Sequence, residues 1–262
     1  MWTRGFLGVL VAALAAAPVL AQTADELAQQ AANPIADLMS IPLQNNTDFG
    51  LGEFDRARNV LNVQPVIPLG GGKLITRTIF PFVRIPDLSQ ESGTRTSGLA
   101  DVNFTAFYVP EQGAVMWGVG PVIEFPTGGA NRGSEKWSVG PSAVLLSQTG
   151  PWTLGVLANN VFSIGGAQDR PDVNRGLLQY FIVRQLGDGW YVNSAPILTV
   201  NWKADQDKWI VPFGAGAGKL VFVGRLPINT QVGAYFNAVK PDIGPDWQLR
   251  IQVQTLLPAP GG

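Results

Sequence analysis

The side chains best suited to binding chemistry lie near the C-terminus, where residues 246–257 read DWQLRIQVQTLL. Gln248, Arg250, Gln252 and Gln254 alternate there with apolar residues. Amide and guanidinium groups form hydrogen bonds with solutes. A period of two indicates a β-strand that carries these polar groups on one face and apolar groups on the other. The segment therefore predicts a hydrogen-bonding surface, and the rest of the chain has to show what lies against each face.

The composition removes most routes to catalysis. The 262 residues include no His and no Cys, so Ser-His pairs, Cys-His pairs and the commonest zinc sites cannot form. No spacing in the sequence indicates catalysis by a pair of carboxylates or by a lysine. Two glycine-rich stretches, TGGANRG (127–133) and GAGAGK (214–219), lack the GK[ST] ending and the following helix of a phosphate-binding loop. We therefore predict no enzyme activity, no catalytic residue, no cofactor and no metal site.

The N-terminus predicts export. MWTRGFLGVLVAALAAAPVLAQ has a charge at Arg4, an apolar run from Phe6 to Ala17 and small residues before Gln22, which is typical of a signal peptide cleaved after Ala21. The alternative is a membrane-anchoring helix, but a span needs about 20 apolar residues and this run is shorter. No other stretch is longer, so a mature chain that enters a membrane must do so as a closed barrel. The formal net charge of -1 offers no basic surface for nucleic acid.

The mature chain consists mainly of predicted strands. Residues 22–42 predict a short helical segment, interrupted by Asn33-Pro34, that lies in the periplasm or plugs a barrel. Residues 43–258 predict the barrel, and 259–262 a C-terminal tail. The expected strands are 43–50, 58–68, 73–84, 99–109, 114–126, 137–148, 152–164, 175–186, 190–202, 208–218, 227–238 and 247–257. Most are close to the roughly 9–11 residues that a tilted strand needs to cross a bilayer. We predict an all-β fold, a transmembrane antiparallel β-barrel of about 12 strands.

The connections support this prediction because short and long ones alternate. Short turns occur at 69–72, 110–113, 149–151 and 187–189, whereas polar loops occupy 85–98, 127–136 and 165–174. Outer-membrane barrels have short periplasmic turns and longer outer loops, so both termini are expected in the periplasm. Residues 219–225, KLVFVGR, are apolar enough to extend a strand or to form an extra hairpin, so the count of strands is open by two either way.

Tryptophan lies near the predicted strand ends. Indole rings prefer the headgroup level of a membrane, where barrels carry girdles of aromatic residues. A soluble sandwich, the alternative, more often places Trp in mid-strand within its core. The expected girdle residues are Trp117, Trp137, Trp152, Trp190, Trp202, Trp209 and Trp247.

The polar positions of the strands predict a hydrated lumen. Four large polar side chains on one strand are too many to bury without water. The expected lumen-lining residues are Asn62, Gln64, Arg77, Asp101, Asn103, Glu124, Asn159, Asn193, Asn201, Gln231, Gln248, Arg250, Gln252 and Gln254. We expect the positive charges of Arg77 and Arg250 to be balanced by the negative charges of Asp101 and Glu124. The simpler hypothesis is that these four residues form ion pairs that stabilise the wall. The alternative is that they recognise a substrate. The alternation does not show whether Arg184 faces the lumen or the lipid.

Several spaced motifs run through nearly the whole mature chain, among them NPIADLMSIPLQNNTDFG, GLADVNFTAFYVP, GWYVNSAPILTVNW and LPINTQVGAYFNAVKPDIGPDWQLRIQVQTLLP. Together they resemble a bacterial family of outer-membrane barrels, the MetA-pathway family of phenol degradation, whose members are often mislabelled neuromedin U. The resemblance implies transport of hydrophobic or aromatic compounds and brings no catalytic residues. The chain departs from many barrel proteins in its ending, LLPAPGG, so that Leu257 stands in place of the terminal aromatic residue read by the barrel-insertion machinery.

The expected function is an outer-membrane channel or transporter for passive uptake of small solutes, hydrophobic or aromatic ones included. The expected partners are outer-membrane lipid, a small-molecule solute and the insertion machinery. The alternative is a structural or surface-interaction barrel with a blocked lumen and no transport. A barrel enzyme acting on lipid is a weaker third reading, because the usual Ser-His machinery is missing.

Overall fold

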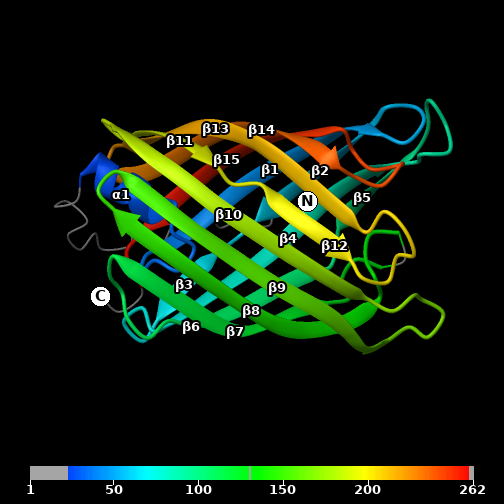
Figure 1. The fold of residues 1–262 in the computed structure, drawn as a ribbon, viewed down its shortest axis with the longest axis horizontal. Helices are drawn as coiled ribbons and strands as arrows, with labels where there is room; N and C mark the ends of the chain where they lie inside the picture. Colours follow the sequence, from blue (N-terminus) through cyan, green and yellow to red (C-terminus); the bar gives the residue numbers. More distant parts are fainter. Residues whose placement is uncertain (1–22, 130, 260–262) are drawn as a thin grey trace, which may run out of the picture.

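The computed structural model describes residues 23–129 and 131–259, and the predicted signal peptide lies outside them. They form a closed antiparallel barrel (Figure 1). The strands are β1 (Met39–Leu51), β2 (Arg56–Val63), β3 (Val66–Leu69), β4 (Leu74–Pro86), β5 (Arg95–Leu99), β6 (Val102–Tyr108), β7 (Val115–Phe125), β8 (Lys136–Thr149), β9 (Trp152–Gly166), β10 (Asn174–Gly187), β11 (Trp190–Ser194), β12 (Ile197–Asn201), β13 (Trp209–Val223), β14 (Leu226–Val239) and β15 (Trp247–Leu257).

Twelve barrel strands arise from these segments because three of them are interrupted. The pairs β2/β3, β5/β6 and β11/β12 each continue along one strand of the wall, since both members pair with the same neighbour. The ring closes through antiparallel pairing of β1 with β15, in register from Met39↔Leu257 to Phe49↔Trp247. The predicted barrel of about 12 strands is therefore confirmed.

The connections divide the barrel into two ends. The turn end carries the connections 70–73, 109–114, 150–151, 188–189 and 224–225, together with the start of β1 and the end of β15. The loop end carries 52–55, 87–94, 126–135, 167–173, 202–208 and 240–246. Residues 219–223 extend β13, so they do not form the extra hairpin that the sequence left open.

The two faces of β15 show how the alternating sequence is used. Trp247, Ile251 and Val253 have exposed side chains on the outer face, 47% exposed in the case of Ile251. Arg250 and Gln254 point inward and are buried. An apolar outer face of this kind suits lipid, because the Gln and Arg side chains of the strand lie on the enclosed side and Thr255 is the one polar residue of its outer face.

A charge placed on either face of β15 tests this assignment. Ile251→Lys is expected to destabilise the folded barrel by about 2–4 kcal/mol, the cost of a cation near the bilayer midplane. Gln248→Lys, on the same strand but facing the interior beside the Asp48 carboxylate, should cost far less. Urea unfolding in phospholipid vesicles measures both, and equal effects of the two substitutions would contradict the lipid-facing assignment.

Not every outward side chain is apolar. Asn45, Thr47 and Asn59 lie on the outer face of β1 and β2, and their side chains bond to one another, with Asn59 Nδ2 donating to Asn45 Oδ1 at 2.9 Å and to Thr47 Oγ1 at 2.8 Å. Mutual hydrogen bonding lowers the cost of these groups at an apolar surface. Arg184, whose direction the alternation did not show, also points outward, where its guanidinium lies 5.4 Å from the centre of the Trp152 ring near the turn end.

All seven candidate girdle tryptophans have exposed side chains, between 39% and 48%. They fall into two groups by position along the strands. Trp117, Trp152 and Trp190 lie at the turn end, and Trp137, Trp202, Trp209 and Trp247 lie at the loop end. At the loop end Trp247 stacks on Phe49, with ring centres 4.3 Å apart, and Trp202 meets Trp209 edge to face.

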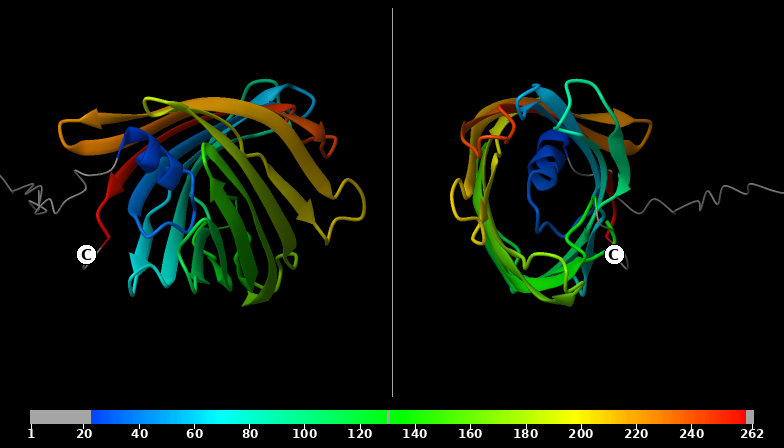
Figure 2. Two further views of the ribbon diagram at one scale, coloured as in Figure 1. Left: turned by 60° about the vertical axis from the view of Figure 1, so that its left-hand side comes forward. Right: turned by 90° about the vertical axis from the view of Figure 1, so that its right-hand side faces the viewer.

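The N-terminal segment begins with helix α1 (Ala24–Ala31). Thr23 and Glu26 form a capping box that satisfies free backbone N–H groups at the start of the helix. Figure 2, which looks along the barrel in its right-hand view, shows α1 inside the ring of strands. Leu27 is fully buried there, in a cluster with Val183, Tyr191 and Leu220 of the wall. Within the described part of the chain, no helix has the length and apolar character to cross a bilayer.

The interior is more apolar than the sequence suggests. Inward side chains of β3 to β10 form a cluster with Ile35, which is fully buried in the N-terminal segment. Its other members are Val66, Ile75, Phe107, Val109, Met116, Val144, Leu146, Leu157 and Phe181. The sequence predicts a hydrated lumen, but this part of the wall is apolar on its inner face, because the N-terminal segment supplies an apolar partner inside the barrel.

Candidate functional site: the barrel lumen

A cavity of about 140 Å³ lies between the N-terminal segment and the polar part of the wall. Gln30, Asn33 and Pro34 border it on one side, and side chains of β1, β3, β4, β10, β11, β14 and β15 border it on the other. The candidate lumen residues that line this cavity are Gln64, Arg77, Asn193, Gln231, Arg250, Gln252 and Gln254. The strands bring these residues together from positions up to 190 apart because the barrel closes β15 against β1.

Arg250 crosses the lumen from β15. Its Nε donates to Asn46 Oδ1 at 3.1 Å, its Nη1 to the Ala195 carbonyl at 2.8 Å and its Nη2 to Gln248 Oε1 at 3.1 Å. The guanidinium also lies 4.6 Å from the centre of the Tyr235 ring. All three acceptors are uncharged, so Arg250 ties two sides of the wall together and keeps its positive charge unneutralised by a direct carboxylate.

Arg77 enters the cavity from β4. Its Nη2 donates to Gln64 Oε1, which is the hydrogen bond that the structure records for this side chain. A guanidinium has five N–H donors, so most of its donor capacity is directed at the cavity rather than at the protein. Arg77 and Arg250 are the charged members of the cavity lining.

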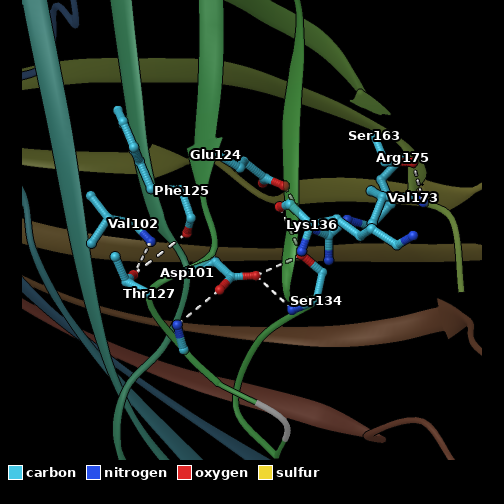
Figure 3. A network of polar contacts seen from close by, with 11 residues as sticks. Asp101, Val102, Glu124, Phe125, Thr127, Ser134, Lys136, Ser163, Val173 and Arg175 are labelled. Carbon is cyan, nitrogen blue, oxygen red and sulfur yellow. Dashed lines mark hydrogen bonds and ion pairs between the residues drawn. The ribbon is translucent and has the colours of Figure 1, made fainter. Parts of the chain in front are cut away.

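Asp101 and Glu124 do not pair with these arginines, so the expected offset of charge is wrong. Asp101 instead accepts hydrogen bonds from Gly128 N at 3.0 Å, Ser134 N at 2.6 Å and Ser134 Oγ at 2.8 Å. Figure 3 shows Asp101 at the centre of this contact network. The loop 126–135 is thereby held to the wall at the loop end. Asp101 lies in the break between β5 and β6, so its carboxylate is free to accept hydrogen bonds from the loop backbone.

Glu124 pairs with an arginine that sequence reasoning did not select. Arg175 Nη2 lies 2.6 Å from Glu124 Oε2, a salt bridge from β10 to β7 that skips the two intervening strands (Figure 3). A second lumen ion pair, at 2.8 Å, joins Asp48 of β1 to Arg58 of β2. The loop half of the lumen thus contains paired charges, whereas the cavity contains unpaired positive charge.

The remaining candidate lumen residues lie closer to the loop end. Asn62 pairs across the strands with Gln44, which lines the cavity. Asn103 pairs with Glu124, and Asn159 with the buried Ser142. Gln248 donates to Asp48 Oδ1 at 2.8 Å, and Asn201 is exposed and accepts from Lys203 N at 3.1 Å.

Sequence reasoning missed part of the site. Tyr191 is buried and donates its hydroxyl to Asn229 Oδ1 at 2.9 Å, and it lines the cavity together with Gln44. The period of two could have placed Gln44 and Asn46 inside, because they share a face with Asp48. Tyr191 gave no such signal, since an aromatic residue near a strand end also fits a girdle.

Direct hydrogen bonds attach the N-terminal segment to the wall. Gln148 Nε2 donates to the Gln29 carbonyl at 2.9 Å, and Gly189 N donates to Asp25 Oδ1 at 2.6 Å. Gln112 Nε2 donates to the Ile35 carbonyl at 3.1 Å. These contacts lie at three separate turns, so the segment is fixed across the turn end rather than along one strand.

The fold defines the class of protein, a closed antiparallel β-barrel of the kind found in outer-membrane channels. The NanC porin is matched with a TM-score of 0.55 and 8% identity, over 83% of this chain and 98% of that one. The COG4313 outer membrane channel from Pseudomonas putida F1 is matched with a TM-score of 0.60 and 17% identity, over 84% and 94%. At these identities the likeness concerns the fold alone.

The family resemblance found in the sequence is confirmed by a family model. The model is described as "Putative MetA-pathway of phenol degradation" and matches residues 45–162, from β1 to β9. None of the curated proteins matches the chain. Outer membrane phospholipase A from Escherichia coli is also matched, with 14% identity over 85% of this chain and 90% of that one, but at a TM-score of 0.41 it carries no argument about function.

Proposed function

We propose that this barrel is a channel through which small solutes cross the outer membrane passively. The observation that supports the proposal best is the cavity inside a closed barrel, bordered by amide and guanidinium side chains that can replace the hydration of a passing solute. Hydrophobic or aromatic solutes fit the family resemblance, and the apolar cluster around Phe181 provides a surface for them.

The orientation in the membrane follows from the connections and the aromatic residues. The turn end lies in the periplasm and the loop end faces the outside, because outer-membrane barrels carry their longer loops outside. The two groups of tryptophans then lie at the two headgroup levels, as girdle residues do. Lipid covers the outer face between them. The barrel-insertion machinery is the expected assembly partner in this proposal, and β15 is the strand that we expect it to recognise.

In this proposal the segment 23–38 is a plug at the periplasmic end. Leu27 and Ile35 are fully buried against the wall, and the hydrogen bonds of Gln29 and Asp25 attach α1 to the turns. The same contacts favour the alternative, a structural or surface-interaction barrel with a permanently blocked lumen. The two functions differ in whether the segment ever leaves its place.

Solute flux and single-channel conductance separate these functions. Mature protein refolded into liposomes is expected to admit small sugars, aromatic acids and alkanols in a swelling assay, and to give discrete current steps in planar bilayers. Heat-denatured protein at the same lipid ratio is the control. A folded barrel without current steps and without swelling for any of these solutes would favour the blocked barrel instead. No hydrolysis of phospholipid is expected in the same liposomes.

A further inference from the structure

The cavity beside the N-terminal segment contains two positive charges and no negative one among its lining residues. Arg77 and Arg250 are its charged members, and the other polar lining groups are amides, hydroxyls and carbonyls. Two carboxylates of the lumen wall, outside this lining, form ion pairs with other arginines, Asp48 with Arg58 and Glu124 with Arg175. A positive cavity enclosed by low-dielectric walls attracts anions more strongly than the same charges would in open water.

Arg77 has the geometry of a ligand-binding cation rather than of a structural one. A structural arginine donates most of its N–H groups to acceptors of the protein, as Arg250 does to three acceptors. Arg77 has one recorded acceptor, the amide oxygen of Gln64, in the break between β2 and β3. The planar guanidinium can present its remaining N–H groups to a carboxylate as two parallel hydrogen bonds.

The rest of the cavity indicates the body of the ligand. Val66, Phe181 and Val183 line it with apolar surface near the amides. A volume of about 140 Å³ corresponds to roughly ten water positions, at the 10–15 Å³ that each requires, which is room for a compact organic acid. A solute with a single negative charge and a small apolar body matches both kinds of surface.

We propose that the cavity is a binding site for small monocarboxylates with a compact apolar body, and that Arg77 binds the carboxylate. Arg250 of β15, three barrel strands from β4, adds a longer-range attraction while its hydrogen bonds hold the wall together. The site gives the channel a preference for organic anions over neutral solutes of the same size. The preference in transport rests on the proposed function. The binding of the carboxylate does not, because binding needs no open pore.

Calorimetric titration of the detergent-solubilised, folded barrel with sodium benzoate tests the proposal, with benzyl alcohol as the neutral probe. Benzoate is expected to bind at least about tenfold more tightly than benzyl alcohol, the contribution of one charge-assisted hydrogen-bond pair. Arg77→Gln should abolish that difference and Arg77→Lys should keep part of it. The matched control is Arg225→Gln, which removes the same charge from the exposed turn after β13.

The outcomes separate this inference from the channel itself. Loss of benzoate binding in Arg77→Gln, with heat-modifiable gel mobility showing a folded barrel and with Arg225→Gln unchanged, supports the site. Equal binding of benzoate and benzyl alcohol, or unchanged binding in Arg77→Gln, overturns it even if the barrel conducts. Benzoate binding without flux in liposomes leaves the site standing and removes the channel. Ion selectivity in a KCl gradient gives a second readout, since Arg77→Gln should lower the permeability ratio of chloride to potassium.

Discussion

Replacing Leu27 with aspartate is expected to increase channel conductance several-fold, because it drives the N-terminal segment out of the lumen. Leu27 is fully buried between α1 and the wall, and burial of a leucine side chain contributes about 1.5–3 kcal/mol. A carboxylate in the same place adds a desolvation cost of several kcal/mol. Together these terms shift a docking equilibrium by about a hundredfold or more, since 1.4 kcal/mol is a factor of ten.

Single-channel recording in planar bilayers measures this effect. Leu27→Met, which keeps the volume and the apolar character, is the matched control and should conduct like the original chain. Because α1 adds no strand to the barrel, the variant should keep its heat-modifiable gel mobility. A folded Leu27→Asp barrel with unaltered current steps would show that the segment does not control the pore, and one with no current at all would support the blocked barrel.

Replacing Gly140 with valine is expected to prevent normal assembly of the barrel wall. An ideal Cβ at Gly140 would lie 1.7 Å from the carbonyl oxygen of Asn160 on the neighbouring strand β9. Gly120 on β7 is equally close to the Ala106 carbonyl, so two adjacent strands rely on glycine for their approach. Backbone atoms cannot rotate away as a flexible side chain can. The substitution should therefore destabilise the barrel by about 3 kcal/mol or more, the upper range of overpacking.

The fraction of protein that refolds into vesicles, read from heat-modifiable mobility, measures the loss for Gly140→Val. Gly113→Val is the matched control, because an ideal Cβ at Gly113 meets no atom within 4 Å. That change lies in a turn and should cost no more than about 0.5 kcal/mol. Refolding of Gly140→Val with the stability of the original chain would show that β8 and β9 can separate locally without loss of the wall.

The sequence predicted the strands well because the period of two and the turn residues are local signals. The segment 247–257 coincides with β15, and 227–238 lies within β14. The breaks within the strands were not predicted. Pro65 lies between β2 and β3, and Pro196 between β11 and β12, where a residue without a backbone N–H interrupts the ladder. At the second break the Ala195 carbonyl is left to accept hydrogen bonds from Arg250 and Gln179.

The site was harder to predict than the fold because the residues that contact one another in it come from distant strands. Alternation placed Arg77 and Glu124 on the inner face, but it could not show that Glu124 reaches Arg175 across two strands. Residues 143–146 of β8, AVLL, are apolar on both faces, since Val144 and Leu146 pack inward in the cluster of Ile35. Without knowledge of the segment inside the lumen, these residues all resemble lipid-facing ones.

The closing pair of strands has a consequence for biogenesis. β1 and β15 join the first and last parts of the barrel over eleven paired positions, from Met39↔Leu257 to Phe49↔Trp247. Two interior contacts fix the alignment of this joint, since Arg250 bonds to Asn46 and Gln248 to Asp48. The barrel closes only when β15 pairs with β1, so closure needs both the first and the last strand of the described barrel. Before this pairing forms, both edge strands of the unfinished wall have unpaired backbone N–H and C=O groups, which can pair with strands of other chains.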